Sequence, residues 1–108
     1  MTLDRYADAV ADLDPGDDEV ATAELVVTDD VLVKAFVLGP GGEVDTHEHA
    51  EATNVFHVLE GEPTVVREDS TASLAAPAVV CNERGVVHGA RNETDERAVV
   101  TASLCPLP

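Results

Sequence analysis

The sequence predicts an all-β protein, an antiparallel sandwich or barrel that follows a short N-terminal helix. Two observations carry this prediction. Short runs rich in Val, Leu and Ala are separated by clusters of turn residues, and the chain has few bulky aromatic side chains, with two Phe, one Tyr and no Trp. Valine favours strands, and many short strands at even spacing are typical of antiparallel barrels and sandwiches. With 108 residues there is room for one core. We therefore expect a single domain over 1–108, with helix and loop over 1–20 and the barrel over 21–108.

The expected helix lies at the N-terminus, where apolar residues recur with helical spacing. These residues are Leu3, Tyr6, Ala7, Val10 and Leu13. Thr2 is a candidate cap, and Pro15-Gly16 ends the pattern. The expected strands cover 22–28, 31–38, 43–49, 54–60, 62–67, 71–76, 78–82, 86–91 and 96–104. Turn residues such as Asp29-Asp30 and Gly39 to Gly42 separate them.

The chain is strongly acidic, and this excludes some partners. Twenty-two acidic residues against six basic ones give a formal net charge of -16 and a pI near 4.2. Such a charge repels phosphate backbones and anionic membranes, so we expect neither nucleic acid nor membrane as a partner. A single Lys and dispersed acidic residues are typical of a halophilic protein. In 1 M salt the Debye length falls to about 3 Å, so the repulsion between the carboxylates is screened. An ordinary acidic protein from a low-salt organism is the alternative.

Cysteine usage and the N-terminus favour a cytoplasmic protein. Cys81 and Cys105 are too few for a disulfide framework. Asp4 and Asp8 lie where a signal peptide needs a basic start and an apolar core. Both cysteines lie in apolar strands without a basic neighbour, so we expect small buried hydrophobes rather than nucleophiles or ligands.

Three of the four histidines form a candidate metal site. His47 and His49 are two residues apart in an expected strand, which places both rings on one face. His88 is the best candidate for a third ligand. Three neutral imidazoles favour Zn, Fe, Ni or Cu over Mg or Ca. His57 has the opposite strand parity to Asn54, so we expect it on the outer surface or at a subunit interface.

Around these residues the sequence resembles the cupin family. The first cupin motif reads Gly, five residues, His-x-His, three or four residues, Glu, six residues, Gly. Gly41, His47, His49 and Gly61 reproduce its spacing, and Asn54 stands at the Glu position.

The second cupin motif reads Gly, five residues, Pro-x-Gly, two residues, His, three residues, Asn. Gly85, His88 and Asn92 match its second half. Glu83 stands at the Pro position and Pro77 at the first Gly. The half that carries the metal ligand is therefore intact.

The resemblance implies a double-stranded β-helix, the jelly-roll cupin barrel, with motifs over 41–61 and 77–92. It also implies one divalent metal ion, Fe, Zn, Ni or Mn, held by His47, His49 and His88. The fourth ligand position is Asn54, which would bind weakly or through a water, and Glu51 is an alternative. Compared with a glutamate, Asn54 leaves a more Lewis-acidic site.

Cupin resemblance further implies a metal-dependent enzyme on a small organic substrate, of dioxygenase, isomerase or lyase type. Some three-histidine family members oxidise thiols or diketones with iron, so the missing glutamate does not by itself abolish activity. The alternative is a non-catalytic module that binds or senses a small ligand, with a degenerate or metal-free site. Small cupins commonly pair, so we expect a homodimer. Lys34 shares strand parity with Leu32 and Phe36; it is either a substrate contact at the barrel mouth or a surface lysine.

Overall fold

The structure is a computed structural model that describes residues 5–106. In chain order its elements are the helix α1 (Arg5–Val10) and the strands β1 (Val20–Val27), β2 (Leu32–Leu38), β3 (Glu43–His47), β4 (Thr53–Glu60), β5 (Thr64–Arg67), β6 (Ser70–Ser73), β7 (Ala78–Asn82), β8 (His88–Arg91) and β9 (Ala98–Cys105). All nine expected strands are present, and several begin or end one to three residues from the expected position. The helix ends at Val10 rather than at Leu13, and Leu3 and the Thr2 cap lie outside the described residues.

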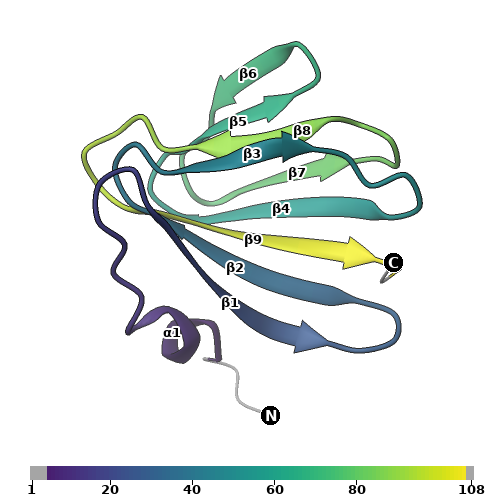
Figure 1. Ribbon diagram of the computed structural model, residues 1–108, viewed down its shortest axis with the longest axis horizontal. Coiled ribbons are helices and arrows are strands. Elements are labelled where there is room, and N and C mark those ends of the chain that lie inside the picture. The colour runs from purple at the N-terminus through teal and green to yellow at the C-terminus, as the bar shows by residue number, and fades with distance from the viewer. Residues whose placement is uncertain (1–4, 107–108) are drawn as a thin grey trace.

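The strands form two antiparallel sheets that face each other, and this confirms the expected jelly roll (Figure 1). One sheet has five strands in the order β1-β2-β9-β4-β7, and the other has four in the order β3-β8-β5-β6. The chain crosses repeatedly between the sheets, so strands distant in sequence become neighbours. In this way β3 and β8, which carry two of the candidate ligands, pair directly.

The main core lies between the sheets and is built from small and medium apolar side chains. Its buried members are Leu38, Phe56, Val58, Val65, Ala90, Ala98, Val100 and Ala102. A second cluster lies on the outer face of the larger sheet, where Val10 of α1 packs with Ala35, Val37 and Val99. The helix therefore covers one end of that face, and β2 and β9 are buried on both sides there.

Gly61 allows the tight connection between β4 and β5. Its φ is +78°, a left-handed conformation that favours glycine. A Cβ at this position would lie 2.7 Å from the carbonyl oxygen of Arg97. Both the backbone conformation and the close approach therefore require the glycine that ends the first motif.

Asn92, the last residue of the second motif, ties together the loops at one end of the barrel. The residue is 1% exposed. Its Nδ2 donates to the carbonyl oxygens of Leu38 (3.0 Å) and Glu96 (2.7 Å). Its Oδ1 accepts from the backbone nitrogen of Thr94 (3.0 Å) and from its Oγ1 (2.7 Å). Asn92 therefore serves the fold rather than the metal site.

We expect Asn92→Ala to lower the free energy of unfolding by about 2 to 3 kcal/mol, because buried carbonyl groups lose their donors. Urea unfolding monitored by circular dichroism measures the change. Thr71→Ala, at an exposed position on β6, is the control and is expected to change stability by less than about 0.5 kcal/mol. An equal, small effect of both substitutions would contradict the structural role of Asn92.

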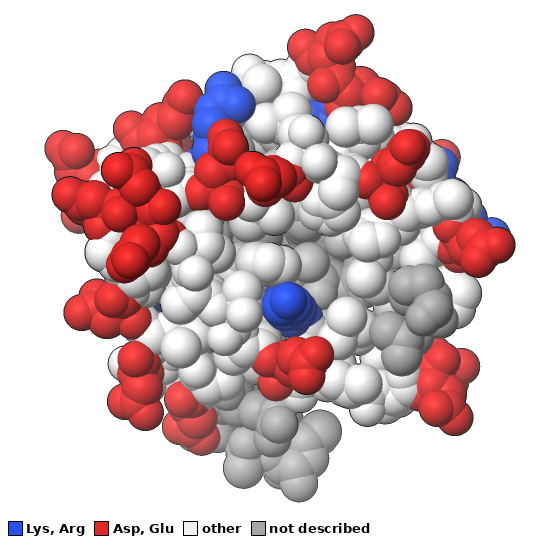
Figure 2. All heavy atoms as spheres, viewed as in Figure 1, with Lys and Arg blue, Asp and Glu red and all other residues white. Residues whose placement is uncertain are grey.

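Acidic side chains are spread over the molecular surface. In the face shown in Figure 2 they surround the periphery, and basic side chains are few. The described ion pairs are Arg91–Glu93 and Arg97–Glu60, both at 2.9 Å between exposed side chains. Most carboxylates on this surface therefore face other carboxylates or solvent, and their mutual repulsion opposes folding.

We expect the melting temperature to rise by at least about 5 °C between 0.1 and 2 M KCl, since screening of roughly 1 kcal/mol of repulsion produces a shift of that size. Differential scanning calorimetry measures it. KCl is preferred to sulfate, which also strengthens apolar burial. A melting temperature that stays level or falls over this range would contradict the expected halophilic character.

No helix within residues 5–106 is long and apolar enough to cross a membrane.

The expectation that the cysteines are buried is wrong, because Cys81 and Cys105 are both exposed. Cys81 lies on β7, an edge strand, on the same outward face as Val79, which is 64% exposed. An apolar run predicts a strand but does not say that both of its faces are covered.

Candidate metal centre

Three histidines come together where β3 ends and its neighbour β8 begins. His47 is the last residue of β3, His88 is the first residue of β8, and the two are register partners. His49 follows in the loop after β3. The strand was expected to continue to residue 49, but it ends at His47 after an irregularity in its pairing with β8. The His49 carbonyl oxygen instead accepts a hydrogen bond from the Gly85 nitrogen at 3.0 Å, which holds this loop.

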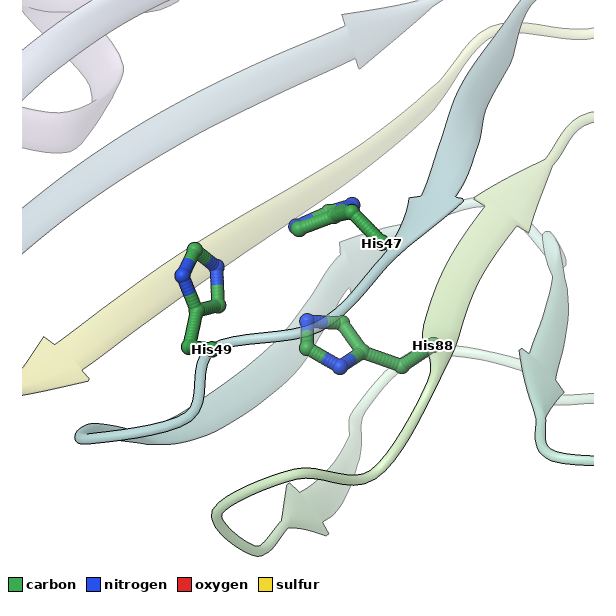
Figure 3. Close-up of side chains that lie close together, drawn as sticks. All are labelled: His47, His49 and His88. Carbon is green, nitrogen blue, oxygen red and sulfur yellow. The ribbon is translucent and has the colours of Figure 1, made fainter.

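The three rings point toward one another (Figure 3). Their centroids are 4.9 Å apart for His47 and His49, 4.5 Å for His47 and His88, and 5.6 Å for His49 and His88. One ligand nitrogen from each ring lies within 4.8 Å of the other two. Tetrahedral Zn–N bonds of about 2.0 to 2.1 Å hold nitrogens about 3.4 Å apart, so a modest approach of the rings brings all three to one ion.

Hydrogen bonds fix the tautomer of two of these rings. His47 Nδ1 donates to the carbonyl oxygen of Asp45, and His88 Nδ1 donates to that of Val86, both at 2.8 Å. A carbonyl oxygen only accepts, so the proton is on Nδ1 and the Nε2 lone pair is free. A backbone carbonyl in this position is the usual orienting partner of a metal-binding histidine.

His88 provides the strongest indication of a ligand. The residue is 1% exposed, and its ring contacts Phe56 edge-on with centroids 5.4 Å apart. Its Nε2 is one of two buried side-chain polar atoms in the described part of the chain that lack a hydrogen-bond partner. A buried polar atom without a partner costs about 1 to 3 kcal/mol. A metal ion at the centre of the triad would supply the missing partner, so the residues present fit the metal that the sequence predicts.

The surroundings of His88 and His49 favour the neutral form of these two rings. Burial lowers the pKa of His88 below its ordinary value of 6.5, and His47 and His49 lower it further, against the opposing effect of the hydrogen bond to Val86. Burial, followed by the proximity of His47, lowers the pKa of His49. Neutral imidazole is the form that binds metals.

These shifts predict how stability depends on pH. Because the folded pKa of His88 is depressed, its contribution is fully present above about pH 6.5 and is lost as the pH falls through the folded value. With a chelator present, we expect the difference in unfolding free energy between the wild type and His88→Gln to be constant above pH 7 and to shift against the wild type in acid. Urea unfolding at pH 8 to 5 measures it. A difference independent of pH would contradict the depressed pKa.

Asn54 occupies the fourth position, on β4 of the opposite sheet. It is 2% exposed, and its Oδ1 accepts a hydrogen bond from Nδ2 of Asn82 at 3.1 Å. Asn82 is its register partner on β7. The Asn54 oxygen therefore already has one partner, and its binding to a metal, directly or through water, stays a prediction. Glu51, the alternative ligand, is exposed, and neither it nor Glu48 belongs to the cluster of ligand atoms found within the described residues.

A cavity of about 200 Å³ adjoins the triad between the two sheets. His47, His49, Asn54 and Lys34 are its polar lining residues; the apolar ones are Leu32, Phe36, Val44, Phe56, Ala90, Val100, Ala102 and Leu104. His57 lies outside this lining, on the outer face of β4, as its parity predicts. Lys34 lines the cavity together with Leu32 and Phe36, as their shared strand parity allows, but parity alone does not distinguish a cavity residue from a surface lysine.

The comparison with known families is decisive for the fold. The family model for the Cupin domain matches residues 35–105. The chain belongs to the cupin family. Both motifs lie within the matched residues. No curated protein matches this cupin.

Solved structures share the fold of this cupin. The protein TT1209 from Thermus thermophilus is 28% identical with a TM-score of 0.79, over 83% of this chain and 86% of that one. A protein with a double-stranded β-helix domain from Klebsiella pneumoniae is 23% identical with a TM-score of 0.81, over 98% and 88%. A predicted oxalate decarboxylase from Thermotoga maritima is 22% identical with a TM-score of 0.77, over 82% and 81%. The chain therefore matches most of the length of each structure.

Proposed function

We propose that this cupin is a metal-dependent enzyme in which His47, His49 and His88 bind one divalent transition-metal ion beside the cavity. The observation that carries the proposal is the buried Nε2 of His88, which has no partner in the described structure and lies in a cluster with two other imidazoles. Three nitrogen donors suit Fe, Zn or Ni, and the family resemblance adds Mn. When bound, such an ion supplies Lewis acidity or binding of dioxygen.

The protein's own residues would position the ligands and the substrate. The carbonyl oxygens of Asp45 and Val86 hold His47 and His88 with Nε2 toward the centre. The apolar walls of the cavity limit access of water and favour a small organic molecule. With Asn54 in place of a carboxylate, the centre keeps the full charge of the ion, which favours a substrate that binds through oxygen atoms. Dioxygenase, isomerase and lyase chemistry all remain candidates, since fold alone does not select among them.

Titration with Co(II) tests the metal site directly. We expect one equivalent to bind and to produce visible absorption bands of nitrogen-coordinated Co(II), with a matching rise in melting temperature that EDTA reverses. Anomalous scattering from a Co(II)-soaked crystal should place the ion between Nε2 of His47, Nε2 of His88 and one ring nitrogen of His49. Absence of stoichiometric binding, or an ion elsewhere, would overturn the proposal.

A binding or sensing module is the second candidate, and the engaged amide of Asn54 favours it, because the residue does not offer the carboxylate of a complete site. Oxygen uptake by the Fe(II)-loaded protein, given a small diketone or a small thiol, and product analysis under nitrogen distinguish the candidates. Turnover that requires the metal supports the enzyme. Stabilisation by a small ligand that persists with EDTA, without turnover, supports the module.

A further inference from the structure

The only lysine of the chain lines the cavity beside the histidine triad. Lys34 lies on β2 between Leu32 and Phe36, and all three residues line the cavity. The alternating strand parity directs them to the space between the sheets. In a chain with 22 acidic residues, the single lysine therefore places its positive charge against an apolar cavity.

Lys34 has no carboxylate partner in the described structure. The side chain is half-buried, and its Nζ lies over the ring of Phe36, 5.5 Å from the centroid. The described ion pairs involve Arg91 and Arg97 and not Lys34. Its register partner on β1, Glu24, is exposed and does not line the cavity. The aromatic face stabilises the ammonium group, but its three donors remain available to a ligand.

The cavity contains no compensating negative charge. None of its described lining residues is Asp or Glu. A cation beside apolar walls favours an anionic ligand, because charge-assisted hydrogen bonds are strongest where water is excluded. The acidic outer surface repels such a ligand, so Lys34 is the group that makes binding of an anion possible.

From this arrangement we propose that the cavity binds a small organic carboxylate, whose carboxylate group contacts Lys34 and whose remaining atoms contact the apolar wall. One end of the ligand contacts Lys34. The placement of its other end rests on the proposed function, because an oxygen atom there would face the metal centre. A volume of about 200 Å³ is below the roughly 300 Å³ at which pockets for drug-sized molecules begin. The ligand is therefore a short-chain acid. Lys34 determines charge specificity and is not assigned a catalytic role.

Butyrate and its neutral counterpart butyramide are suitable probes, because they have the same chain length and differ in charge. Binding is followed by ¹H–¹⁵N chemical-shift perturbation and calorimetry, first on metal-free protein in EDTA and then on Co(II)-loaded protein. We expect the wild type to bind butyrate about tenfold or more tightly than butyramide, which is the usual size of a hydrogen bond to a charged group.

Matched variants assign this preference to Lys34. Lys34→Met keeps the chain length and apolar packing and should abolish the preference, whereas Lys34→Arg should retain most of it. Arg67→Met removes one positive charge from an exposed position on β5 and should leave the preference unchanged. Glu24→Gln removes the negative charge of the register partner of Lys34 and should preserve or raise the preference, because less negative charge then opposes the carboxylate of the ligand. Melting temperatures confirm that each variant is folded.

The outcomes separate this inference from the metal proposal. Loss of the preference in metal-free Lys34→Met supports the inference even when Co(II) does not bind. An equal preference in Lys34→Met and the wild type overturns it even when Co(II) binds at the triad. Equal binding of butyrate and butyramide to the wild type, or binding of neither in both metal states, also overturns it.

Discussion

Replacing His88 by alanine should weaken binding of Co(II) or Zn(II) at least about 100-fold. Structural metal sites with four ligands are worth about 10 to 16 kcal/mol, or roughly 3 kcal/mol for each ligand, and 1.4 kcal/mol is a factor of ten. His88 is the buried ligand, with its ring fixed by Val86 and Phe56. Loss of its Nε2 leaves only the imidazoles of His47 and His49, which are more exposed than His88 and are not sufficient to hold the ion. Competition with a chromophoric chelator measures the affinity.

His47→Ala should have a similar effect, and His57→Ala is the matched control. His57 lies on β4 with its side chain on the outer face, away from the described cluster of ligand atoms. Its removal should leave the metal affinity within about twofold. Metal binding that weakens equally in all three variants would point to damaged folding rather than a lost ligand. Metal binding that is unaffected in His88→Ala would exclude the triad as the site.

The same variants should separate folding from metal binding in a thermal experiment. With metal at 100 times its dissociation constant, the wild type gains about 2.7 kcal/mol of stability. His88→Ala should gain no more than about 0.4 kcal/mol, because a 100-fold weaker dissociation constant leaves at most half of the sites occupied at this concentration. The melting temperature in EDTA reports the separate packing effect of losing the buried ring.

The sequence was sufficient to predict the fold because the apolar runs, the turn residues and the spacing of the two motifs all indicate the same barrel. Apolar runs separated by turn residues predicted most of the strands, and Gly41 and Gly61 each adopt a positive φ where the chain was expected to turn. The fixed spacing around His47 and His88 identified residues that the fold brings together, although 41 positions separate them. That step required the family motifs, since periodicity alone does not report which strands pair.

Other features depend on tertiary contacts that no local pattern reports. His49 reaches the site from a loop, held by Gly85, and not from a continuing strand. Exposure of Cys81 follows from the edge position of β7, which is known only once the strand order is known. The hydrogen bond between Asn54 and Asn82 links two residues whose relation comes from the pairing of β4 with β7. The sequence accordingly predicted the triad but not the surroundings that define its chemistry.

Asn54→Glu should lower the stability of the metal-free protein and raise the stability of the metal-bound protein. At pH 8 in EDTA, a carboxylate at this 2%-exposed position should destabilise the protein by about 1 to 3 kcal/mol, since a buried charge without a cation costs free energy. With Co(II), the same carboxylate becomes a fourth ligand and reduces the net charge of the centre from +2 to +1. We expect the metal affinity to rise about 10- to 100-fold.

Asn54→Gln is the control, because glutamine has the size of glutamate and no charge. It should share the loss of packing and of the Asn82 hydrogen bond geometry without gaining metal affinity. Calorimetric melting with EDTA and with excess Co(II), together with chelator competition, gives both quantities for the three proteins. If Gln and Glu raise the affinity equally, Asn54 is not at a ligand position. If only Glu does so, and the order of stability between wild type and Asn54→Glu is reversed by metal, then position 54 faces the ion. The natural asparagine then keeps the metal-free fold stable while leaving a centre of higher charge for a ligand.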